Sequence, residues 1–241
     1  VVTGGAGELG REMVRTLAEA GANIAIAYHS SEAKARALAE EVGGLGVRAA
    51  AIHADVTSQE SVFRLRDEVD RTLGPVDIAV CNAVVQYDWK PILEQAEDDY
   101  ESQFRSCVLH TVFMVKAFVP AMKERGWGRE IAVNTECAMQ CAPHQSAYAS
   151  AKRGMDGIIR VLAREAGPFG VTANEVAPGW TVSDRSPAGQ DDEDYTARSV
   201  MQRRGKAREI ANAVAFLASD LASYINGAYI PVCGGNVMPT I

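Results

Sequence analysis

A tyrosine and a lysine four positions apart, Tyr148 and Lys152, have the clearest catalytic potential in the sequence. In a helix this spacing places both side chains on one face. An ammonium group near a phenol lowers the phenol's pKa from its usual value of about 10, so the pair could move a proton near neutral pH. Thr135 lies thirteen residues upstream, at the end of the strand that is expected before this helix. The alternative is an ordinary pair on the surface, because this spacing is common by chance.

A second chemical feature is the glycine-rich segment from Thr3 to Gly10, which lies between an opening strand and the first helix. Glycines allow a tight turn and let backbone N–H groups approach a pyrophosphate, while the helix N-terminus adds partial positive charge. An ordinary glycine-rich loop is the alternative. Its position within a strand–turn–helix unit favours dinucleotide binding.

These residues are carried by short apolar strands that alternate with amphipathic helices along the chain. After an opening strand at Val1–Thr3, we expect strands at Asn23–Tyr28, Val47–His53, Val76–Asn82, Ile131–Thr135, Val171–Val176 and Ala228–Val232. Helices are expected at Leu9–Glu19, Ser31–Val42, Gln59–Leu73, Asp98–Arg125, Ala147–Glu165 and Arg208–Ser219.

This alternation predicts an α/β fold of the Rossmann type, with a doubly wound parallel sheet between two helical layers. Strands that are apolar on both sides fit a sheet covered on both faces. We expect one dinucleotide-binding domain over residues 1–241, because no linker or repeat interrupts the pattern. The polar, acidic segment 181–201 breaks the rhythm, and such segments are often lids over a substrate site.

Composition excludes several classes of protein. The 241 residues carry a net charge of −7, which argues against a nucleic-acid partner. No apolar run is expected to be long enough to span a membrane. The chain opens inside a strand, so we expect that some N-terminal residues are missing and take the cytoplasm as the default location.

The five cysteines are odd in number and show no paired pattern, so they do not suggest a disulfide framework. Cys137 and Cys141 would meet on a helix, and His110 follows Cys107 by three positions. A zinc site is the alternative to buried free thiols, and the absence of a CxxC or HxxxH spacing favours thiols and no metal.

The glycine-rich segment resembles the TGxxxGxG motif of the short-chain dehydrogenase/reductase family. Gly4 and Gly10 match, but Glu8 stands where the family has its middle glycine. A carboxylate about 4 Å from a pyrophosphate charge would cost ~1 kcal/mol even at water-like screening. Either Glu8 turns to solvent or pairs with Arg11, or the cofactor is bound in an unusual way.

The resemblance extends along the whole chain. Tyr148 and Lys152 match the family's YxxxK motif. Thr135 stands at the family's catalytic serine, which implies that its hydroxyl holds the substrate oxygen, and Cys137 is the alternative if two residues are deleted. Asn82-Ala83 resembles part of an NNAG motif, with Cys81 and Val84 departing from it. The resemblance implies cofactor contacts at Gly4, Leu9, Gly10, Ser30, Asp55, Val56, Asn82, Ala83, Tyr148, Lys152, Pro178, Gly179 and Ser183. The family's helix asparagine is missing, because Cys107 or Val108 occupies its position.

The implied chemistry is hydride transfer between a nicotinamide and a carbonyl or secondary alcohol, with Tyr148 as general acid or base. NADP is expected in preference to NAD, because Tyr28 replaces the carboxylate that binds a ribose 2′-hydroxyl, and Ser30 and Lys34 follow it.

We expect a reductase similar to the 3-oxoacyl-carrier-protein reductases of this family, acting on a small molecule and forming a homodimer or homotetramer. The family's tetramers join through the helices that carry Cys107 and Lys152 here. The alternative is a catalytically impaired dinucleotide-binding or regulatory protein, which Glu8, Val84, Cys107 and Cys233 favour.

Overall fold

A seven-stranded parallel sheet forms the centre of the computed structural model, which describes residues 1–184, 186–189 and 193–238. The strand order is β3-β2-β1-β4-β5-β6-β9, and every pairing is parallel. The strands are β1 (Val2–Thr3), β2 (Ile24–Tyr28), β3 (Ala49–His53), β4 (Ile78–Cys81), β5 (Gly128–Val133), β6 (Val171–Pro178) and β9 (Tyr229–Val232). The predicted doubly wound, Rossmann-type sheet is confirmed.

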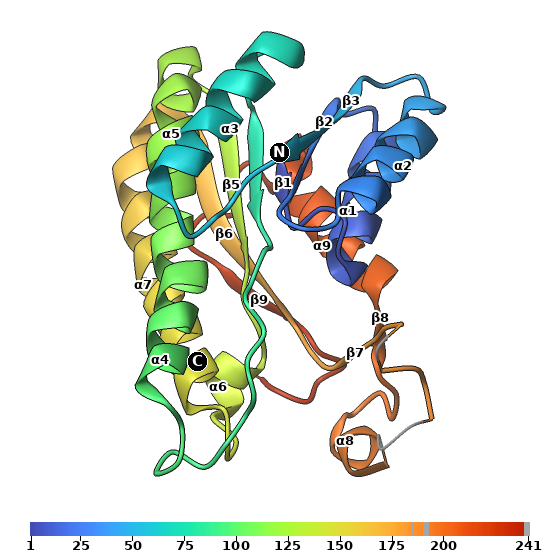
Figure 1. Cartoon of the computed structure of the whole chain (residues 1–241), viewed down its shortest axis with the longest axis vertical. Coiled ribbons are helices and arrows are strands. Elements are labelled where there is room, and N and C mark those ends of the chain that lie inside the picture. Colours follow the sequence, from blue (N-terminus) through green and yellow to red (C-terminus); the bar gives the residue numbers. More distant parts are fainter. Residues whose placement is uncertain (185, 190–192, 239–241) are drawn as a thin grey trace.

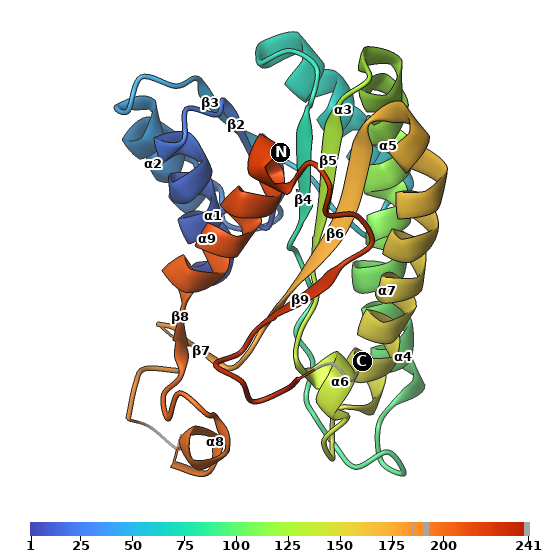
Figure 2. The ribbon, with the colours of Figure 1, turned by 180° about the vertical axis from the view of Figure 1, so that it is seen from behind.

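Helices cover both faces of the sheet, as Figures 1 and 2 show. One layer contains α3 (Gln59–Thr72), α5 (His110–Arg125) and α7 (Ser146–Ala166), and the other contains α1 (Glu8–Glu19), α2 (Glu32–Gly43) and α9 (Ala207–Ala218). Alternate residues of the strands belong to two apolar clusters, one under each layer: Ile26 packs with α1 and α2, while its neighbours Ala25 and Ala27 pack with α3 and α5. This two-sided burial explains why the strands are apolar throughout.

The predicted helix at Asp98–Arg125 is a single helical stretch with a change of pitch. It consists of α4 (Glu97–Gln103), a π-helix at Phe104–Leu109 and α5. This stretch, Glu97–Arg125, is long and apolar enough to span a membrane by length and composition alone, which corrects the expectation that no such run exists. In the structure α5 packs on α3, α7 and the sheet, so its apolar surface serves the core.

The described part of segment 181–201 contains short regular elements that its composition does not predict. It contains β7 (Thr181–Val182) and α8 (Glu193–Arg198), and β7 pairs with β8 (Gly205–Lys206). Asp191 and Asp192 lie outside the described residues. Shorter elements are α6 (Cys137–Gln140) and two 3₁₀ turns at Gly167–Phe169 and Asp220–Ala222.

Candidate active site

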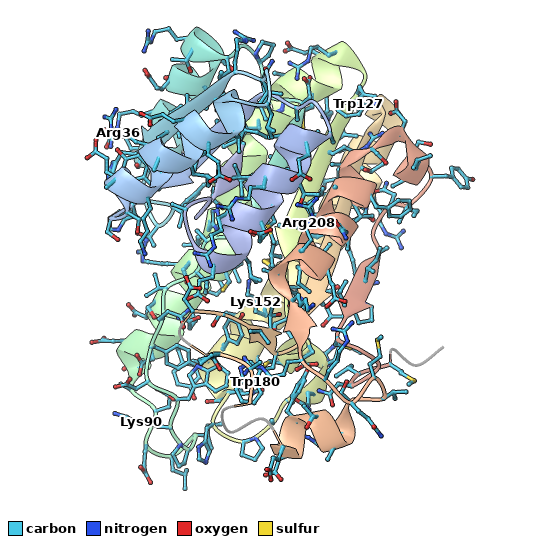
Figure 3. All side chains as sticks on the ribbon, turned by 90° about the vertical axis from the view of Figure 1, so that its right-hand side faces the viewer. Arg36, Lys90, Trp127, Lys152, Trp180 and Arg208 are labelled. Atoms are coloured by element: carbon cyan, nitrogen blue, oxygen red, sulfur yellow. The ribbon has the colours of Figure 1, made fainter. Side chains whose placement is uncertain are left out.

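The three predicted catalytic residues meet at the carboxyl end of β5. Thr135 follows this strand, and its hydroxyl hydrogen-bonds the Tyr148 hydroxyl from the first turn of α7. One turn later, Lys152 is 3% exposed, and its Nζ lies 5.7 Å from the centre of the Tyr148 ring. The Nζ donates a hydrogen bond to the Val133 carbonyl at 2.6 Å. Figure 3 shows Lys152 within the body of the molecule, whereas Arg36 and Lys90 lie on its outside.

Aromatic side chains from the loop after β4 cover Tyr148. The Trp89 ring stacks on the Tyr148 ring at 6.1 Å, and the Tyr87 hydroxyl accepts the Tyr148 N–H at 3.0 Å. Burial raises the pKa of Tyr148 above its usual value, and the hydrogen bond with Thr135 only partly offsets this effect. Tyr148 as a whole is half-buried, and the partial loss of water around its phenol outweighs the lowering that is expected from Lys152, whose ammonium group bonds to Val133.

Below the catalytic residues lies a buried network that was not predicted. Asn134 donates through Nδ2 to the Lys152 carbonyl at 3.2 Å and to Glu175 Oε1 at 2.8 Å. Burial raises the pKa of Glu175 to about 8, and the nearby Asp156 carboxyl adds to this rise. Glu175 belongs to β6 and is 1% exposed. The network therefore fixes the backbone of the catalytic helix to two neighbouring strands.

The glycine-rich turn has the compact form that its composition predicts. A Cβ atom on Gly10 would overlap the Gly4 carbonyl oxygen, and Gly4 itself has φ of +60°. The turn is held by the Thr3 hydroxyl, which accepts hydrogen bonds from the N–H groups of Asn82 at 2.9 Å and Ala83 at 3.2 Å. Asn82 Nδ2 also donates to the Thr3 carbonyl at 2.9 Å. Asn82 and Ala83 are thus brought beside the turn, as the motif resemblance implies.

This turn fits the pyrophosphate of a dinucleotide in shape. Helix α1 begins at Glu8, with Leu9 after it, and its N-cap residue Gly7 offers no side-chain cap to the first N–H groups. Glu8 is half-buried at this N-terminus, so its charge lies where an anionic ligand would be bound. The Arg11 guanidinium binds both carboxylate oxygens of Asp184 at 2.8 and 3.0 Å, and the nearby Glu8 carboxylate contributes to the raised pKa of Arg11.

The residues expected near the adenosine half lie at the ends of β2 and β3. Tyr28 is 8% exposed and packs edge-on against His53, while His29 and Ser30 are exposed beside it. Asp55 Oδ1 accepts hydrogen bonds from the Thr57 hydroxyl and N–H at 2.7 and 2.9 Å. Asp55 thus stabilises its own turn, and the neighbouring Val56 is partly exposed to solvent.

The remaining predicted contacts lie where the chain leaves β6. Pro178 ends this strand, and a Cβ atom on the next residue, Gly179, would come within 2.9 Å of Cys233 Cα. Ser183 is half-buried near the start of segment 181–201 and accepts the Ser186 N–H through Oγ at 3.1 Å. The structure therefore places Ser183 on the same carboxyl edge of the sheet as Pro178.

Segment 181–201 is held over this edge by residues that the sequence analysis missed. Glu136 is 4% exposed, and its carboxylate accepts hydrogen bonds from the Tyr195 hydroxyl at 3.2 Å and from Asn236 Nδ2 at 2.9 Å. The Arg204 guanidinium lies 4.0 Å from the Trp180 ring centre and donates to the Thr181 and Ser186 carbonyls. The carboxylate directly after Thr135 is the one signal in the sequence for this contact.

The cysteines do not form a metal centre in the part of the chain that the structure describes, where no group of three or more potential ligands occurs. All five are free thiols, and Cys81, Cys107 and Cys233 are buried. Cys107 lies in the π-helix, as does Val108, and His110 immediately follows this helix.

Comparisons with known proteins place the chain in a family. A family model described as "Enoyl-(Acyl carrier protein) reductase" matches residues 4–236. The chain is 36% identical over 241 residues to 3-oxoacyl-(acyl-carrier-protein) reductase FabG of Escherichia coli K12, covering 99% of this chain and 96% of the relative. The corresponding protein of Staphylococcus epidermidis (strain ATCC 35984) is 35% identical over 240 residues, covering 99% and 98%.

Two solved structures have nearly the same backbone. A blue fluorescent protein from a metagenomic library, in complex with NADPH, has a TM-score of 0.92 and 36% identity, covering 98% of this chain and 96% of that one. A double mutant of a Serratia marcescens short-chain dehydrogenase/reductase has a TM-score of 0.92 and 31% identity, covering 98% and 96%.

Proposed function

Since this chain belongs to the short-chain dehydrogenase/reductase family, a family of NAD(P)-dependent oxidoreductases, we propose that it reduces the ketone of a 3-oxoacyl thioester with NADPH. The observation that carries the proposal is the meeting of Thr135, Tyr148 and Lys152 beside the glycine-rich turn. The relatives named as 3-oxoacyl-(acyl-carrier-protein) reductases support the substrate class.

Each catalytic side chain has a distinct proposed role. A bound NADPH supplies the hydride. The Thr135 hydroxyl holds the substrate carbonyl oxygen, and Tyr148 donates its phenolic proton to that oxygen as negative charge develops there. Lys152 stabilises the resulting phenolate by its positive charge and binds the ribose of the cofactor.

The state of Tyr148 favours reduction over oxidation. Burial raises the pKa of Tyr148, so the phenol holds its proton across the neutral range. A protonated phenol is the form that a carbonyl reduction consumes, whereas alcohol oxidation requires the phenolate. We therefore place the working direction at ketone reduction, tested by assaying acetoacetyl-coenzyme A with NADPH and 3-hydroxybutyryl-coenzyme A with NADP⁺ in parallel. Turnover of the ketone should be the faster of the two at pH 7.

The cofactor fits the described residues in all but one respect. The uncapped N-terminus of α1 and the close-packed turn suit the pyrophosphate, and we assign Gly4, Leu9, Gly10, Asn82 and Ala83 to this half. Ser30, Asp55 and Val56 are assigned to the adenosine, and Pro178, Gly179 and Ser183 to the nicotinamide. Glu8 is the residue that opposes binding.

We expect NADPH to raise the melting temperature of the protein by roughly 5–10 °C at about one hundred times its dissociation constant, because a ligand bound only to the folded state stabilises it. NADH should give a smaller shift at equal concentration, and differential scanning fluorimetry measures both. A Ser30→Ala variant should weaken the binding of NADPH but not that of NADH, so the difference between the two shifts in melting temperature should become smaller. We propose that Ser30 and Lys34 bind the 2′-phosphate of NADPH, and a larger shift with NADH would contradict this site. No shift with either nucleotide would contradict the proposed function.

Replacing Glu8 by glutamine removes its charge and preserves its size. We expect Glu8→Gln to tighten NADPH binding on the order of fivefold at low salt, with a smaller gain at high salt, because the carboxylate repels the pyrophosphate. Isothermal titration calorimetry measures the dissociation constants. Glu19→Gln at the other end of α1 is the control, since Glu19 pairs with Arg208 far from the turn. Weaker binding in Glu8→Gln would mean that the carboxylate contributes to the site.

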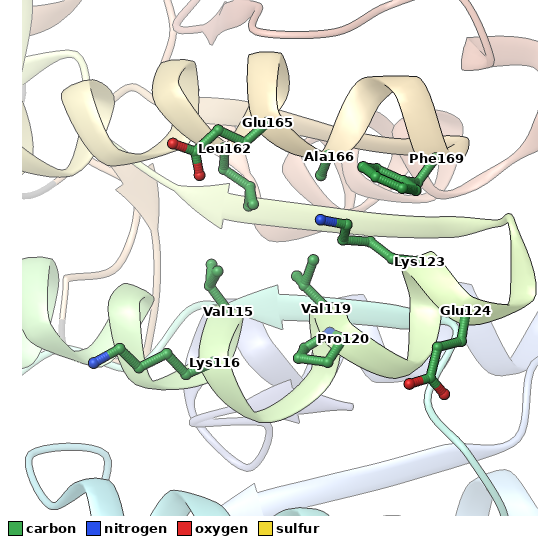
Figure 4. A pocket seen from close by; sticks show the side chains of 10 residues that line it. All are labelled: Val115, Lys116, Val119, Pro120, Lys123, Glu124, Leu162, Glu165, Ala166 and Phe169. Carbon is green, nitrogen blue, oxygen red and sulfur yellow. The ribbon is translucent and has the colours of Figure 1, made fainter.

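We also propose that the chain forms a homodimer or homotetramer through the outer faces of α5 and α7, in the cytoplasm. A groove of about 550 Å³ lies between these helices, lined by apolar side chains including Val115, Val119, Leu162 and Phe169 (Figure 4). The groove is also lined by two lysines and two glutamates, Lys116, Lys123, Glu124 and Glu165. In a contact between two copies, lysines of one copy could pair with glutamates of the other. Segment 181–201 is proposed as the substrate lid of a single domain.

A further inference from the structure

Trp89 is the aromatic side chain that packs on the proton donor of the proposed reaction. Its ring stacks on the Tyr148 ring, with 6.1 Å between the centroids and 29° between the planes. Trp89 is 48% exposed, so part of the indole contacts Tyr148 and its neighbours while another part faces solvent. The indole therefore lies at the boundary between the solvent and the catalytic phenol.

The side-chain amide of Gln95 fixes the backbone on both sides of Trp89. Its Oε1 accepts the Lys90 N–H at 2.9 Å, and its Nε2 donates to the Asp88 carbonyl at 3.1 Å. The same Nε2 donates to Asp99 Oδ2, in the first turn of α4. Gln95 thus holds the residues before and after Trp89 and connects them to the start of a helix.

The same loop is attached at two further points before Trp89. The Tyr87 hydroxyl accepts the N–H of Tyr148 at 3.0 Å. Gln103 Nε2, at the buried end of α4, donates to the Val85 carbonyl at 2.9 Å. Moving the indole aside would break several of these hydrogen bonds, each of which stabilises the loop. Trp89 is therefore preorganised and acts as a fixed wall of the site.

The position of this wall determines which substrates fit. The substrate carbonyl oxygen must reach the Tyr148 hydroxyl beside that of Thr135. The ketone carbon of a 3-oxoacyl thioester carries an alkyl arm and an arm that leads to the thioester. The thioester arm continues into a large polar carrier, so it must extend to solvent, and the alkyl arm packs against apolar surface. On the Trp89 side of the phenol that surface is the indole, which each additional methylene group would have to displace.

We propose that Trp89, held in place by Gln95, is a specificity-determining residue that restricts the substrate to short 3-oxoacyl chains. The inference rests on the proposed function and adds a limit on acyl length to it. An apolar pocket discriminates against one methylene group by about 10–200-fold, so a wall that cannot relax gives a large preference over several methylene groups. Gln95 is a positioning residue, because it acts on the substrate only through Trp89.

Steady-state kinetics with acetoacetyl-coenzyme A and 3-oxooctanoyl-coenzyme A, each with NADPH, test this limit on length. We expect the wild-type kcat/KM to be at least about one hundredfold higher for the short substrate, and Trp89→Ala to reduce this ratio to about tenfold or less. The ratio isolates the wall, because both substrates use the same Tyr148 and any change in the proton donor cancels. Equal wild-type kcat/KM for the two thioesters would overturn the proposal.

Gln95→Leu tests the positioning role, because leucine has a similar size and cannot form the two backbone hydrogen bonds. We expect it to lower the ratio in the same direction as Trp89→Ala and to accelerate hydrogen exchange at the Lys90 amide. Leu93→Ala is the matched control, since Leu93 lies in the same loop and is 97% exposed. It should change neither quantity. Faster exchange in Gln95→Leu with an unchanged ratio would overturn the role of Gln95.

A binding measurement separates this proposal from the proposed function. Isothermal titration calorimetry with butanoyl- and octanoyl-coenzyme A, in the presence of NADP⁺, requires no turnover. Without a wall the longer chain should bind more tightly, because it buries more apolar surface. We expect the wild type to bind it roughly tenfold more weakly and Trp89→Ala to reverse this order. If the wild type reduces no ketone but shows this difference, the proposed function fails and the wall stands. Equal or tighter binding of the octanoyl thioester by the wild type would overturn the wall, whatever the activity.

Discussion

Tyr148→Phe should reduce the turnover of acetoacetyl-coenzyme A by about a thousandfold while NADPH still raises the melting temperature. The phenylalanine ring preserves the stacking against Trp89 and the backbone hydrogen bond to Tyr87, so the fold of the site remains. The variant lacks the one proton donor that Thr135 and Lys152 surround, and general acid catalysis contributes about 10²–10⁴ in rate. Stopped-flow measurement of NADPH oxidation follows the chemical step directly.

Tyr100→Phe provides the matched control for that experiment. The Tyr100 hydroxyl is 2.8 Å from Ser146 Oγ at the first residue of α7, so this variant also removes one phenolic hydrogen bond from the catalytic helix. It should lower the melting temperature slightly and leave the rate unchanged. A Tyr148→Phe enzyme with near wild-type turnover would remove Tyr148 from the mechanism, because no compensating change in folding could explain retained activity.

The architecture could be predicted from the sequence because burial on two faces leaves a clear pattern. The strand expected at Asn23–Tyr28 is Ile24–Tyr28, and the helix expected at Leu9–Glu19 is Glu8–Glu19. The π-helix within Glu97–Arg125 could not be predicted, because one extra residue in a turn leaves the apolar period nearly unchanged. Tertiary packing, rather than local propensity, determines that feature.

Some features of the candidate site could likewise be predicted from the sequence, and others could not. Tyr148 and Lys152 could be paired from their spacing on one helix, and the structure brings Thr135 to them. The bidentate contact of Arg11 with Asp184 spans 173 positions, so nothing local in either segment predicts it. The expected net lowering of the pKa of Tyr148 was wrong for a related reason, because the cost of burial depends on the aromatic side chains that pack around Tyr148 in the folded protein.

Glu175→Gln should make the protein more stable, and the gain should increase with pH. Glu175 is buried in the central sheet beside Asp156, and its pKa is about 8 in the folded protein against 4.5 for an unperturbed glutamate. Between these values the folded state binds a proton that the unfolded state has released. The stability of the wild-type protein therefore falls as pH rises from about 4.5 to about 8, and it is greatest below that window.

Glutamine cannot ionise, so it avoids this loss while its Oε1 still accepts the hydrogen bond from Asn134 Nδ2. The difference between a pKa of about 8 and one of 4.5 corresponds to an upper limit of roughly 4–5 kcal/mol above pH 8. Urea unfolding at pH 5, 7 and 8.5 measures the gain, which should be small at pH 5 and approach this limit at pH 8.5. Glu101→Gln, on the exposed face of α4, should show no such trend. A gain that is independent of pH would mean that Glu175 is ionised in both states and that the buried network beneath Lys152 holds a carboxylate rather than a carboxylic acid.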